Sequence, residues 1–402
     1  MRSRIMNICI AAVMAAALSS CGNTGGNNDT SAAQTAGTEA QVQTEAASPE
    51  AAAEKKSPEE LLAGMTVEEK VYQLFVVTPE ALTGFGQVTQ AGDATKSSIE
   101  EKPVGGLIYF AQNLETKEQT TEMLTTVQQY AKARSGMGML LAVDEEGGMV
   151  ARCADSLGTT AFEGMMYYGD KGDTEEAYNI GKTIGTDIKG LGFNLDFAPV
   201  ADVDLCEENE LADRCFSSDP YVVAGMVEKE IAGFHDAGIP CTLKHFPGLG
   251  AESGNSHEDT QIIIDRSLEQ LREEEFVPFK RGIDAGADLV MVGHQQMTGV
   301  GDGLPSDLSS KVITEILRGE LGFDGVVVTD SQQMNTITDL YSPSEAAVLS
   351  IKAGADIILM PDDLDAAFKG VTDAVRSGDI AESRIDESVM RILKLKEKYG
   401  MI

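Results

Sequence analysis

The chain has 402 residues and a formal net charge of −34, from 31 lysines and arginines against 65 acidic residues. This balance argues against a nucleic-acid partner, because phosphate binding needs a basic surface, and against electrostatic attachment to anionic lipid. Hydrophobic residues make up 42% of the chain, which is enough for the core of one α/β barrel or of two smaller domains.

The N-terminus has the features of an export signal. Arg2 and Arg4 precede an apolar run over 8–18 that is too short to span a bilayer comfortably. The run ends in Leu18-Ser19-Ser20-Cys21, which resembles the cleavage site of a bacterial lipoprotein. We therefore expect a signal peptide over 1–20 and lipid on Cys21, anchoring an extracytoplasmic protein to the bacterial cell membrane. The alternative is an ordinary secretion signal with an incidental cysteine.

Residues 21–57 consist almost entirely of small and polar residues, which cannot bury enough apolar surface to offset the entropy of ordering. This composition predicts a disordered tether, followed by one folded domain over 58–402. Near the start of that domain, Thr66 and Glu69 have the spacing of a capping box, which predicts the beginning of a helix.

Through the rest of the chain, apolar β-rich runs alternate with amphipathic segments. The predicted strands are 74–78, 105–110, 140–144, 193–200, 241–246, 288–294, 325–330 and 356–361. The predicted helices are 117–134, 174–190, 221–237, 267–285, 309–320, 343–353, 364–377 and 385–399. Nearly continuous hydrophobicity is typical of parallel strands that are covered on both faces. Eight strands alternating with helices predict an α/β fold, a single TIM-type (β/α)8 barrel. A doubly wound open sheet is the alternative, although no glycine-rich dinucleotide loop follows the first strand.

The cysteines that follow Cys21 do not form a metal-binding pattern. Cys153, Cys206, Cys215 and Cys241 have no zinc-ligand spacing, and the chain has no cofactor motif, so we expect neither a metal nor a cofactor. Cys206 and Cys215 share one predicted loop, where they are either bridged by a disulfide or present as free thiols.

Polar residues fall at the ends of several apolar strands. Asp144, Lys244-His245, His294 and Asp330 each end a predicted strand, and Asp202 and Arg214 follow the fourth. In a barrel these ends converge on one face, where the active site is expected. Charged groups on several buried strands are costly unless they pair or bind a ligand, so the pattern predicts an enzyme.

Four ordered motifs resemble glycoside hydrolase family 3, and within it the β-N-acetylglucosaminidases. The first is Lys244-His245-Phe246-Pro247-Gly248-Leu249-Gly250, with Asn255-Ser256-His257 shortly after it. The others are Asp144-Glu145-Glu146-Gly147-Gly148 with Arg152, Asp213-Arg214-Cys215-Phe216, and Gly322-Phe323-Asp324-Gly325 leading to Thr329-Asp330-Ser331. The resemblance extends from about Thr66 to Tyr399.

The resemblance implies a role for each candidate residue. Asp330 would be the nucleophile of a retaining mechanism, and His257 the group that protonates the leaving oxygen and then deprotonates water. The residues implied in holding the sugar are Asp144, Arg152, Arg214, Lys244 and His245. Taken without the motif, a loop histidine such as His257 is more often a surface residue, and each charged residue could belong to a structural ion pair.

Two positions depart from the family pattern. Asn255 stands where an aspartate usually orients the catalytic histidine, and Leu249 stands where a histidine usually follows the Lys-His-Phe-Pro-Gly motif. An amide accepts a hydrogen bond but offers no charge, so we expect slower proton transfer at His257. Alternatively, an acid of the same loop takes over the orienting role. The candidates are Glu252, Glu258 and Asp259.

These residues predict a retaining exo-β-N-acetylglucosaminidase that acts on peptidoglycan fragments or related glycans with terminal β-linked N-acetylglucosamine. A related β-glucosidase is one enzymatic alternative. A phosphorylase is another, since a neutral His–Asn pair would repel an anionic phosphate acceptor less than a His–Asp pair. A non-catalytic glycan-binding lipoprotein is the alternative from another class, and Asn255 is the feature that favours it.

Overall fold

The computed structural model describes residues 56–206, 208–253 and 261–402. The predicted signal peptide, Cys21 and all but the last two residues of the tether therefore lie outside the described residues. Within the described residues, no helix is both long and apolar enough to cross a membrane.

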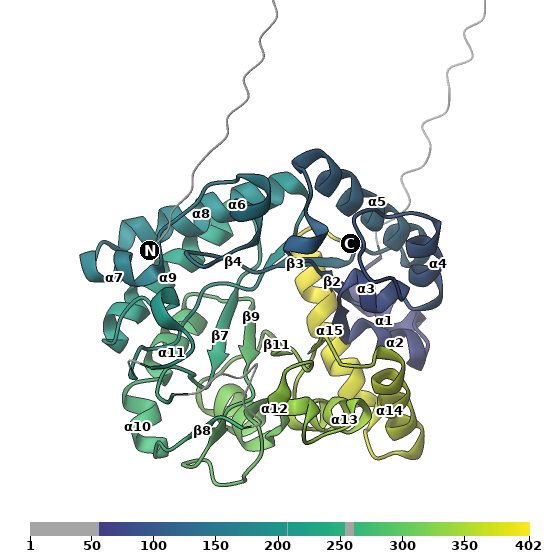
Figure 1. Ribbon diagram of the computed structural model, residues 1–402. Helices are drawn as coiled ribbons and strands as arrows, with labels where there is room; N and C mark the ends of the chain where they lie inside the picture. The colour runs from purple at the N-terminus through teal and green to yellow at the C-terminus, as the bar shows by residue number, and fades with distance from the viewer. Residues whose placement is uncertain (1–55, 207, 254–260) are drawn as a thin grey trace, which may run out of the picture. The chain divides into compact units, whose positions relative to one another are not determined.

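Eight parallel strands of the described chain succeed one another in chain order, as predicted. Two sheets contain them, with the orders β12-β1-β2-β3-β6 and β11-β9-β7. Isolated bridges join the sheets on both sides, between Val200 and Lys244 and between Val328 and Ile357. The strands thus follow one another around a ring, which confirms the predicted barrel architecture and excludes the open sheet (Figure 1). Their bounds are β1 Phe75–Val77, β2 Gly106–Ile108, β3 Leu140–Val143, β6 Leu195–Asp196, β7 Thr242–Phe246, β9 Leu289–Val292, β11 Val326–Thr329 and β12 Ile358–Leu359.

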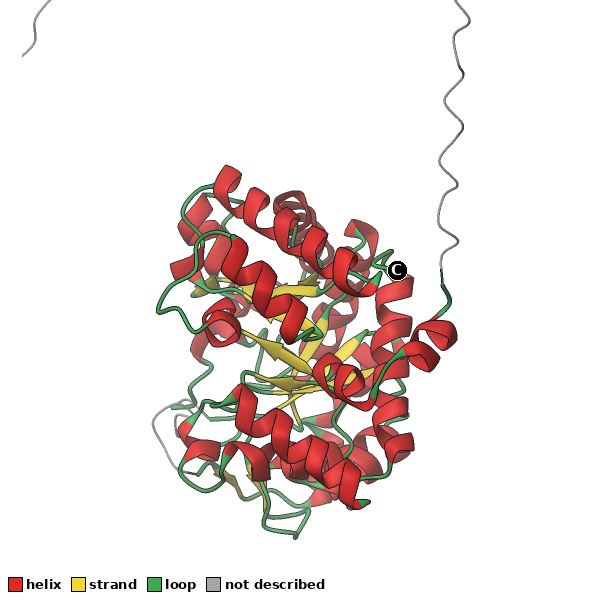
Figure 2. Cartoon of the chain, turned by 90° about the vertical axis from the view of Figure 1, so that its right-hand side faces the viewer, coloured by secondary structure: helices red, strands yellow, loops and turns green. Residues whose placement is uncertain are grey.

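Helices surround the strands, which lie at the centre of the molecule in Figure 2. The helices between and after the strands match the predicted segments. They are α5 Lys117–Ser135, α8 Thr174–Leu191, α9 Pro220–Ala237, a π-helix η4 Lys311–Glu320, α13 Pro343–Ala353, α14 Leu364–Ser377 and α15 Glu382–Lys398. The predicted capping box is also present, because the Thr66 hydroxyl accepts from the Glu69 amide and the Glu69 carboxylate accepts from the Thr66 amide at the start of α2 (Val67–Gln73).

One predicted helix was wrong in its continuity. The segment 267–285 forms two helices, α10 (Leu268–Glu273) and α11 (Phe276–Asp284), instead of one. Pro278 explains the break, because a proline inside a continuous helix would clash with the carbonyl group four residues earlier, at Glu274. The interruption before Phe276 places Pro278 in the first turn of α11, where a proline is tolerated.

The sequence analysis did not predict the shorter elements, several of which shape the loops around the barrel. They are α1 Pro58–Gly64, α3 Pro79–Thr83, α4 Asp93–Glu101, η1 Ala111–Asn113, β4 Glu145–Gly147, β5 Val150–Ala151, α6 Arg152–Leu157, α7 Met165–Lys171, η2 Ala212–Arg214, β8 Ile263–Ile264, β10 Gln296–Met297, η3 Ser306–Leu308 and α12 Asn335–Thr338.

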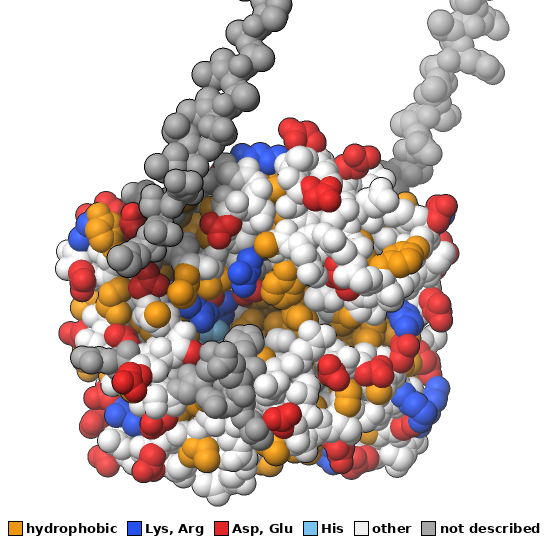
Figure 3. Space-filling model, in the orientation of Figure 1, with side chains coloured by type: hydrophobic (Ala, Val, Ile, Leu, Met, Phe, Trp, Pro, Cys, Tyr) orange, Lys and Arg blue, Asp and Glu red, His pale blue; other side chains and the backbone are white. Residues whose placement is uncertain are grey.

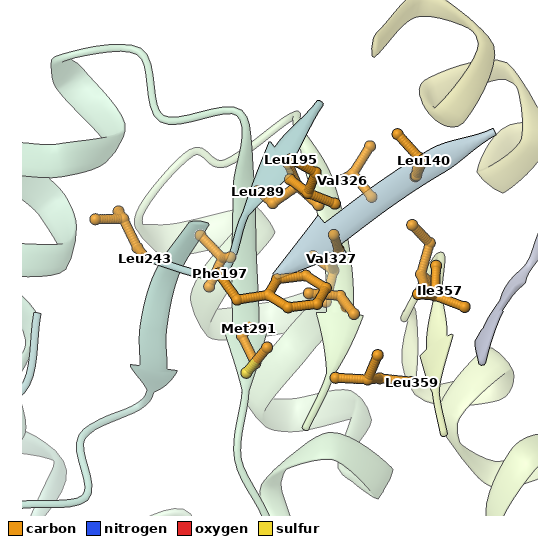
Figure 4. Close-up of a cluster of buried hydrophobic side chains, with 14 of the residues drawn as sticks. Leu140, Leu195, Phe197, Leu243, Leu289, Met291, Val326, Val327, Ile357 and Leu359 are labelled. Atoms are coloured by element: carbon orange, nitrogen blue, oxygen red, sulfur yellow. The ribbon is translucent and has the colours of Figure 1, made fainter. Parts of the chain in front are cut away.

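The barrel interior is apolar along most of its length. Side chains from neighbouring strands meet there, among them Leu140, Leu195, Leu289 and Val326 (Figure 4). All of them are almost completely buried. Because strands covered on both faces bury every side chain, the continuous hydrophobic runs of the sequence are accounted for.

A buried carboxylate ties the C-terminal helix to the strands. Asp356, which is fully buried just before β12, accepts from Arg318 Nη2 at 2.7 Å and from the Val327 amide at 3.0 Å. Its other oxygen contacts Ser388 Oγ at 2.6 Å and Arg391 Nη1 at 3.1 Å, both on α15. One side chain therefore links η4, β11 and α15.

We predict that Asp356→Asn destabilises the fold by about 3–5 kcal/mol, because it removes the charge that compensates partly buried arginines while keeping the side-chain shape. Urea unfolding followed by circular dichroism measures the loss. Asp379→Asn is the matched control, since the Asp379–Lys352 pair is about half exposed and is worth less than about 1 kcal/mol. Equal losses in the two variants would contradict the assigned role of Asp356.

Candidate active site

A cavity of about 350 Å³ opens at the carboxyl ends of the strands. Six residues singled out in the sequence line it together: Asp144, Arg152, Arg214, Lys244, His245 and Asp330. Apolar side chains complete the wall, including Ile108, Phe110, Met291 and Met360. On the face shown in Figure 3, the molecule is hollowed near its centre, where basic, apolar and histidine side chains gather.

The centre of the charged wall is Glu146. Its carboxylate binds Arg214 through two bonds of 2.8 Å, from Nε and Nη2, and contacts Lys244 Nζ at 2.6 Å. Burial opposes the charge on Glu146, but Arg214 and Lys244 outweigh it and hold the pKa of this carboxyl far below its usual range. Glu146 is therefore ionised, and it fixes the positions of two cations.

Lys244 also contacts Asp144 Oδ1 at 2.9 Å. Burial lowers the pKa of the ammonium group, but Asp144 and Glu146 together raise it above its ordinary value, so Lys244 is charged. An ammonium group has three N–H donors. Among the described residues, that of Lys244 has two carboxylate partners, Asp144 and Glu146. A donor therefore remains for a ligand in the cavity.

Glu146 belongs to one of the sequence motifs, but its role could not be predicted from the sequence. The signal was the acidic pair directly after an apolar strand. Glu145 and Glu146 have different roles. Whereas Glu146 pairs with cations, the Glu145 carboxylate accepts from the amides of Cys153 and Ala154 at 2.6 and 2.9 Å. Burial raises the pKa of Glu145 to about 7. Glu145 anchors the first turn of α6, whose first residue, Arg152, lines the cavity with its guanidinium 5.9 Å from the Phe110 ring centre.

Asp202, which is fully buried, orients His245. Its Oδ2 accepts from His245 Nδ1 at 2.7 Å and from the His245 amide at 2.9 Å. Because Nδ1 donates to a carboxylate, Nε2 is directed to the opposite side, 3.5 Å from Arg214 Nη2. The other oxygen of Asp202 accepts from the Leu249 amide at 2.7 Å. Thus Leu249, which departs from the family pattern, supplies a backbone anchor and an apolar side chain to the cavity wall.

Asp330 follows β11 directly and lines the same cavity. Its amide donates to Val292 O at 2.9 Å, and its Oδ1 accepts from the Ser331 amide at 2.7 Å. Burial acts to raise its pKa, but His245, His294 and the Ser331 amide lower the pKa below the ordinary value. The carboxylate is therefore ionised near neutral pH and suited to attack an electrophilic carbon.

His294 lies behind the cavity wall and is not among the residues that line it. Its Nδ1 is 3.0 Å from Asp307 Oδ1, and its Nε2 is 2.9 Å from the Ser331 carbonyl oxygen. The strand-end position predicted from the sequence is correct, but direct contact with a ligand in this cavity is not supported.

Several predictions fall on residues that the structure does not describe. His257 and Asn255 lie in 254–260, together with Glu258 and Asp259, so their positions relative to the cavity stay predictions. Glu252 is described and exposed, and it does not line the cavity. Glu210, which the sequence analysis missed, adds a carboxylate to the wall from the long loop after β6.

The cysteines described here are free thiols, so Cys206 and Cys215 do not bridge one another. The structure does group His235, Cys241 and Asp288 at the opposite end of β9, where their ligand atoms lie within 4.8 Å of one another. Sequence spacing could not reveal this group, because its members come from three separate elements. The Asp288 carboxylate already accepts from His235, Lys398 and Tyr399, and the group takes no part in the cavity.

Comparison with known proteins places this arrangement in a family. Residues 66–395 match the glycosyl hydrolase family 3 N terminal domain. The chain is 30% identical to Beta-hexosaminidase A of Pseudoalteromonas piscicida over 75% of this chain, but it spans only 54% of the length of that relative. It is 31% identical to the Beta-hexosaminidase of Nitrosomonas eutropha, covering 78% of this chain and 91% of that one.

A solved structure gives the same result. The family 3 β-N-acetylglucosaminidase of Paenibacillus sp. str. FPU-7 superposes with a TM-score of 0.79 and 38% identity, covering 84% of this chain and 63% of that one. With its motifs at the strand ends of a parallel α/β barrel, this chain belongs to glycoside hydrolase family 3.

Proposed function

We propose that the protein is a retaining β-N-acetylglucosaminidase. The observation that carries the proposal is the ionised Asp330 beside the Lys244–Glu146–Arg214 array in one cavity. The names of its relatives, β-hexosaminidases and a β-N-acetylglucosaminidase, support the same sugar.

In the proposed reaction, an Asp330 carboxylate oxygen attacks the anomeric carbon as the bond to the leaving oxygen breaks, and His257 gives that oxygen a proton. His257 then takes a proton from water, which attacks the anomeric carbon and releases Asp330. Lys244, Arg214 and Asp144 hold the sugar hydroxyls through charge-assisted hydrogen bonds. Because Glu146 fixes Lys244 and Arg214, and Lys244 in turn contacts Asp144, before a ligand enters, little reorganisation accompanies binding.

The cavity volume supports action on a terminal sugar. About 350 Å³ lies at the small end of the range for ligand sites, which suits one sugar residue better than a continuous stretch of glycan. We therefore propose that the enzyme removes single terminal residues from peptidoglycan fragments or related glycans.

The first test is hydrolysis of p-nitrophenyl β-N-acetylglucosaminide by the fragment from Pro58, beside the β-glucoside, with and without phosphate. We expect preferential release from the acetylated sugar without a need for phosphate. Asp330→Asn should reduce kcat/KM by at least about 10³-fold while retaining sugar binding in calorimetry, because it removes the nucleophile and little of the cavity shape.

Two results would contradict parts of the proposed function. A folded wild-type protein that binds the sugar without turnover would indicate a glycan-binding module. Strict dependence on phosphate would indicate a phosphorylase.

Asn255→Asp is predicted to raise kcat on the order of tenfold, because a carboxylate orients the His257 imidazole and stabilises its protonated form. The same stabilisation should move the upper arm of the pH profile to higher pH. Glu252→Gln and Glu258→Gln are the companions, and a large loss in either one would identify a substitute orienting acid. An unchanged rate in Asn255→Asp would show that this position does not limit catalysis.

We also propose that the protein is a lipoprotein anchored through Cys21, on the basis of the N-terminal sequence. Cys21→Ala should move the protein from the membrane fraction to the soluble fraction and abolish incorporation of a fatty-acid label in a bacterial host. Cys153→Ala, which changes a buried thiol, is the control and should leave the fractionation unchanged. Membrane retention of unlabelled Cys21→Ala would point to an uncleaved signal as the anchor.

A further inference from the structure

A second buried His–Asp pair lies directly behind the segment that carries Asp330. His294 follows β9, and Asp307 lies in η3. Both side chains have no exposed surface, and His294 Nδ1 is 3.0 Å from Asp307 Oδ1. The backbone fixes the approach, because the Asp307 amide donates to the carbonyl of Gly293, the residue before His294.

The contacts of the ring indicate its protonation state. Nδ1 faces the Asp307 carboxylate, and Nε2 faces the Ser331 carbonyl oxygen at 2.9 Å. Nε2 donates to the carbonyl, and the negative charge of Asp307 only 3.0 Å from Nδ1 stabilises a proton on that nitrogen as well, which makes the ring a cation. Consistently, Asp307 outweighs the effect of burial and raises the pKa of His294 to about 9.

Ser331 connects this cation to the nucleophile. Its carbonyl accepts from His294, while its amide donates to Asp330 Oδ1 at 2.7 Å. The next residue is held by the same network, since Gln332 Nε2 donates to Ser350 Oγ at 2.8 Å and lies 3.4 Å from Asp307 Oδ2. The turn that begins at Asp330 is therefore held from behind by His294 and Asp307.

We propose that His294, kept as a buried imidazolium by Asp307, is a positioning residue that holds the Asp330–Ser331 turn and keeps Asp330 ionised. This inference rests on the proposed function, in which Asp330 is the nucleophile. His294 acts through Ser331 and through its charge, without touching the sugar.

The charged groups around the pair define the expected electrostatics. Asp307 and Asp330 face His294, while Lys244 adds positive charge near Asp330. Tyr341 lies near Asp307, and burial together with that carboxylate raises the pKa of its hydroxyl, so it is neutral. His294 is therefore a source of positive charge behind Asp330, and its removal should raise the pKa of Asp330.

The protein contains its own control. At the other end of β9, His235 Nε2 of α9 contacts Asp288 at 2.9 Å, so a His–Asp pair lies near each end of this strand. Replacement of His235 removes a similar His–Asp contact at the end of β9 that is far from the cavity.

The experiment compares His294→Gln, Asp307→Asn and His235→Gln with the wild-type chain. In His294→Gln the amide can still donate to Ser331, but the charge is lost. We expect the acidic limb of kcat/KM to move up by about one pH unit, because Asp330 then protonates at higher pH. We also expect kcat/KM to fall about 10- to 100-fold at the optimum through misplacement of the turn. Asp307→Asn should act in the same direction, and His235→Gln should leave the limb in place.

Nuclear magnetic resonance separates this inference from the proposed function. The chain has only four histidines, so the His294 ring nitrogens can be assigned with single variants. We expect an imidazolium at pH 7.5 in the wild type and its loss in Asp307→Asn. Titration of the ¹³C-labelled Asp330 carboxyl should show a higher pKa in His294→Gln, whether or not the protein turns over a glycoside.

Two outcomes would overturn the inference. One is a neutral His294 ring at pH 7.5. The other is an Asp330 titration that is the same in His294→Gln as in the wild type, even if the variant unfolds more easily. Absence of glycosidase activity with the expected titrations would reject the proposed function and leave the electrostatic coupling standing.

Discussion

The cavity depends on one buried carboxylate shared by two cations. Glu146 lies between Arg214 and Lys244, and the three come from β4, η2 and β7. Burying such charges is costly unless they are closely paired, so the network constrains three separate segments to one geometry. The consequence is functional as well as structural. In the proposed function, the donors of Lys244 and Arg214 that Glu146 already fixes would hold the sugar without rearranging when it binds.

The two ends of β9 have different roles, because contacts near its start stabilise the fold and contacts near its end support the cavity. At its start, Asp288 binds Lys398 and Tyr399 and so fastens the C-terminal segment to the barrel. At its end, His294 supports the turn after β11. In both places a histidine faces an aspartate, but the two pairs contact different parts of the protein. This division follows the rule that barrel function is concentrated at the carboxyl ends of the strands.

The sequence predicted the strands well, because runs such as Val326–Thr329 are buried on both faces and their hydrophobicity is nearly continuous. It also predicted the lining residues that sit directly at strand ends, such as Asp144 and Asp330. It did not predict the roles of Glu146 and Asp307, because their partners are distant in the chain and are brought together only by the fold. The α10–α11 break was missed although its cause, Pro278, was in the sequence.

The charges of the cavity bear on the choice of acceptor. Among its described lining residues, the four carboxylates of Asp144, Glu146, Glu210 and Asp330 outnumber three fixed cations. Two of those cations, Lys244 and Arg214, are already paired with Glu146. An excess of carboxylates among the described lining residues repels a phosphate anion but not neutral water. The described wall therefore offers no excess of positive charge for a phosphate acceptor, in keeping with the hydrolysis proposed above.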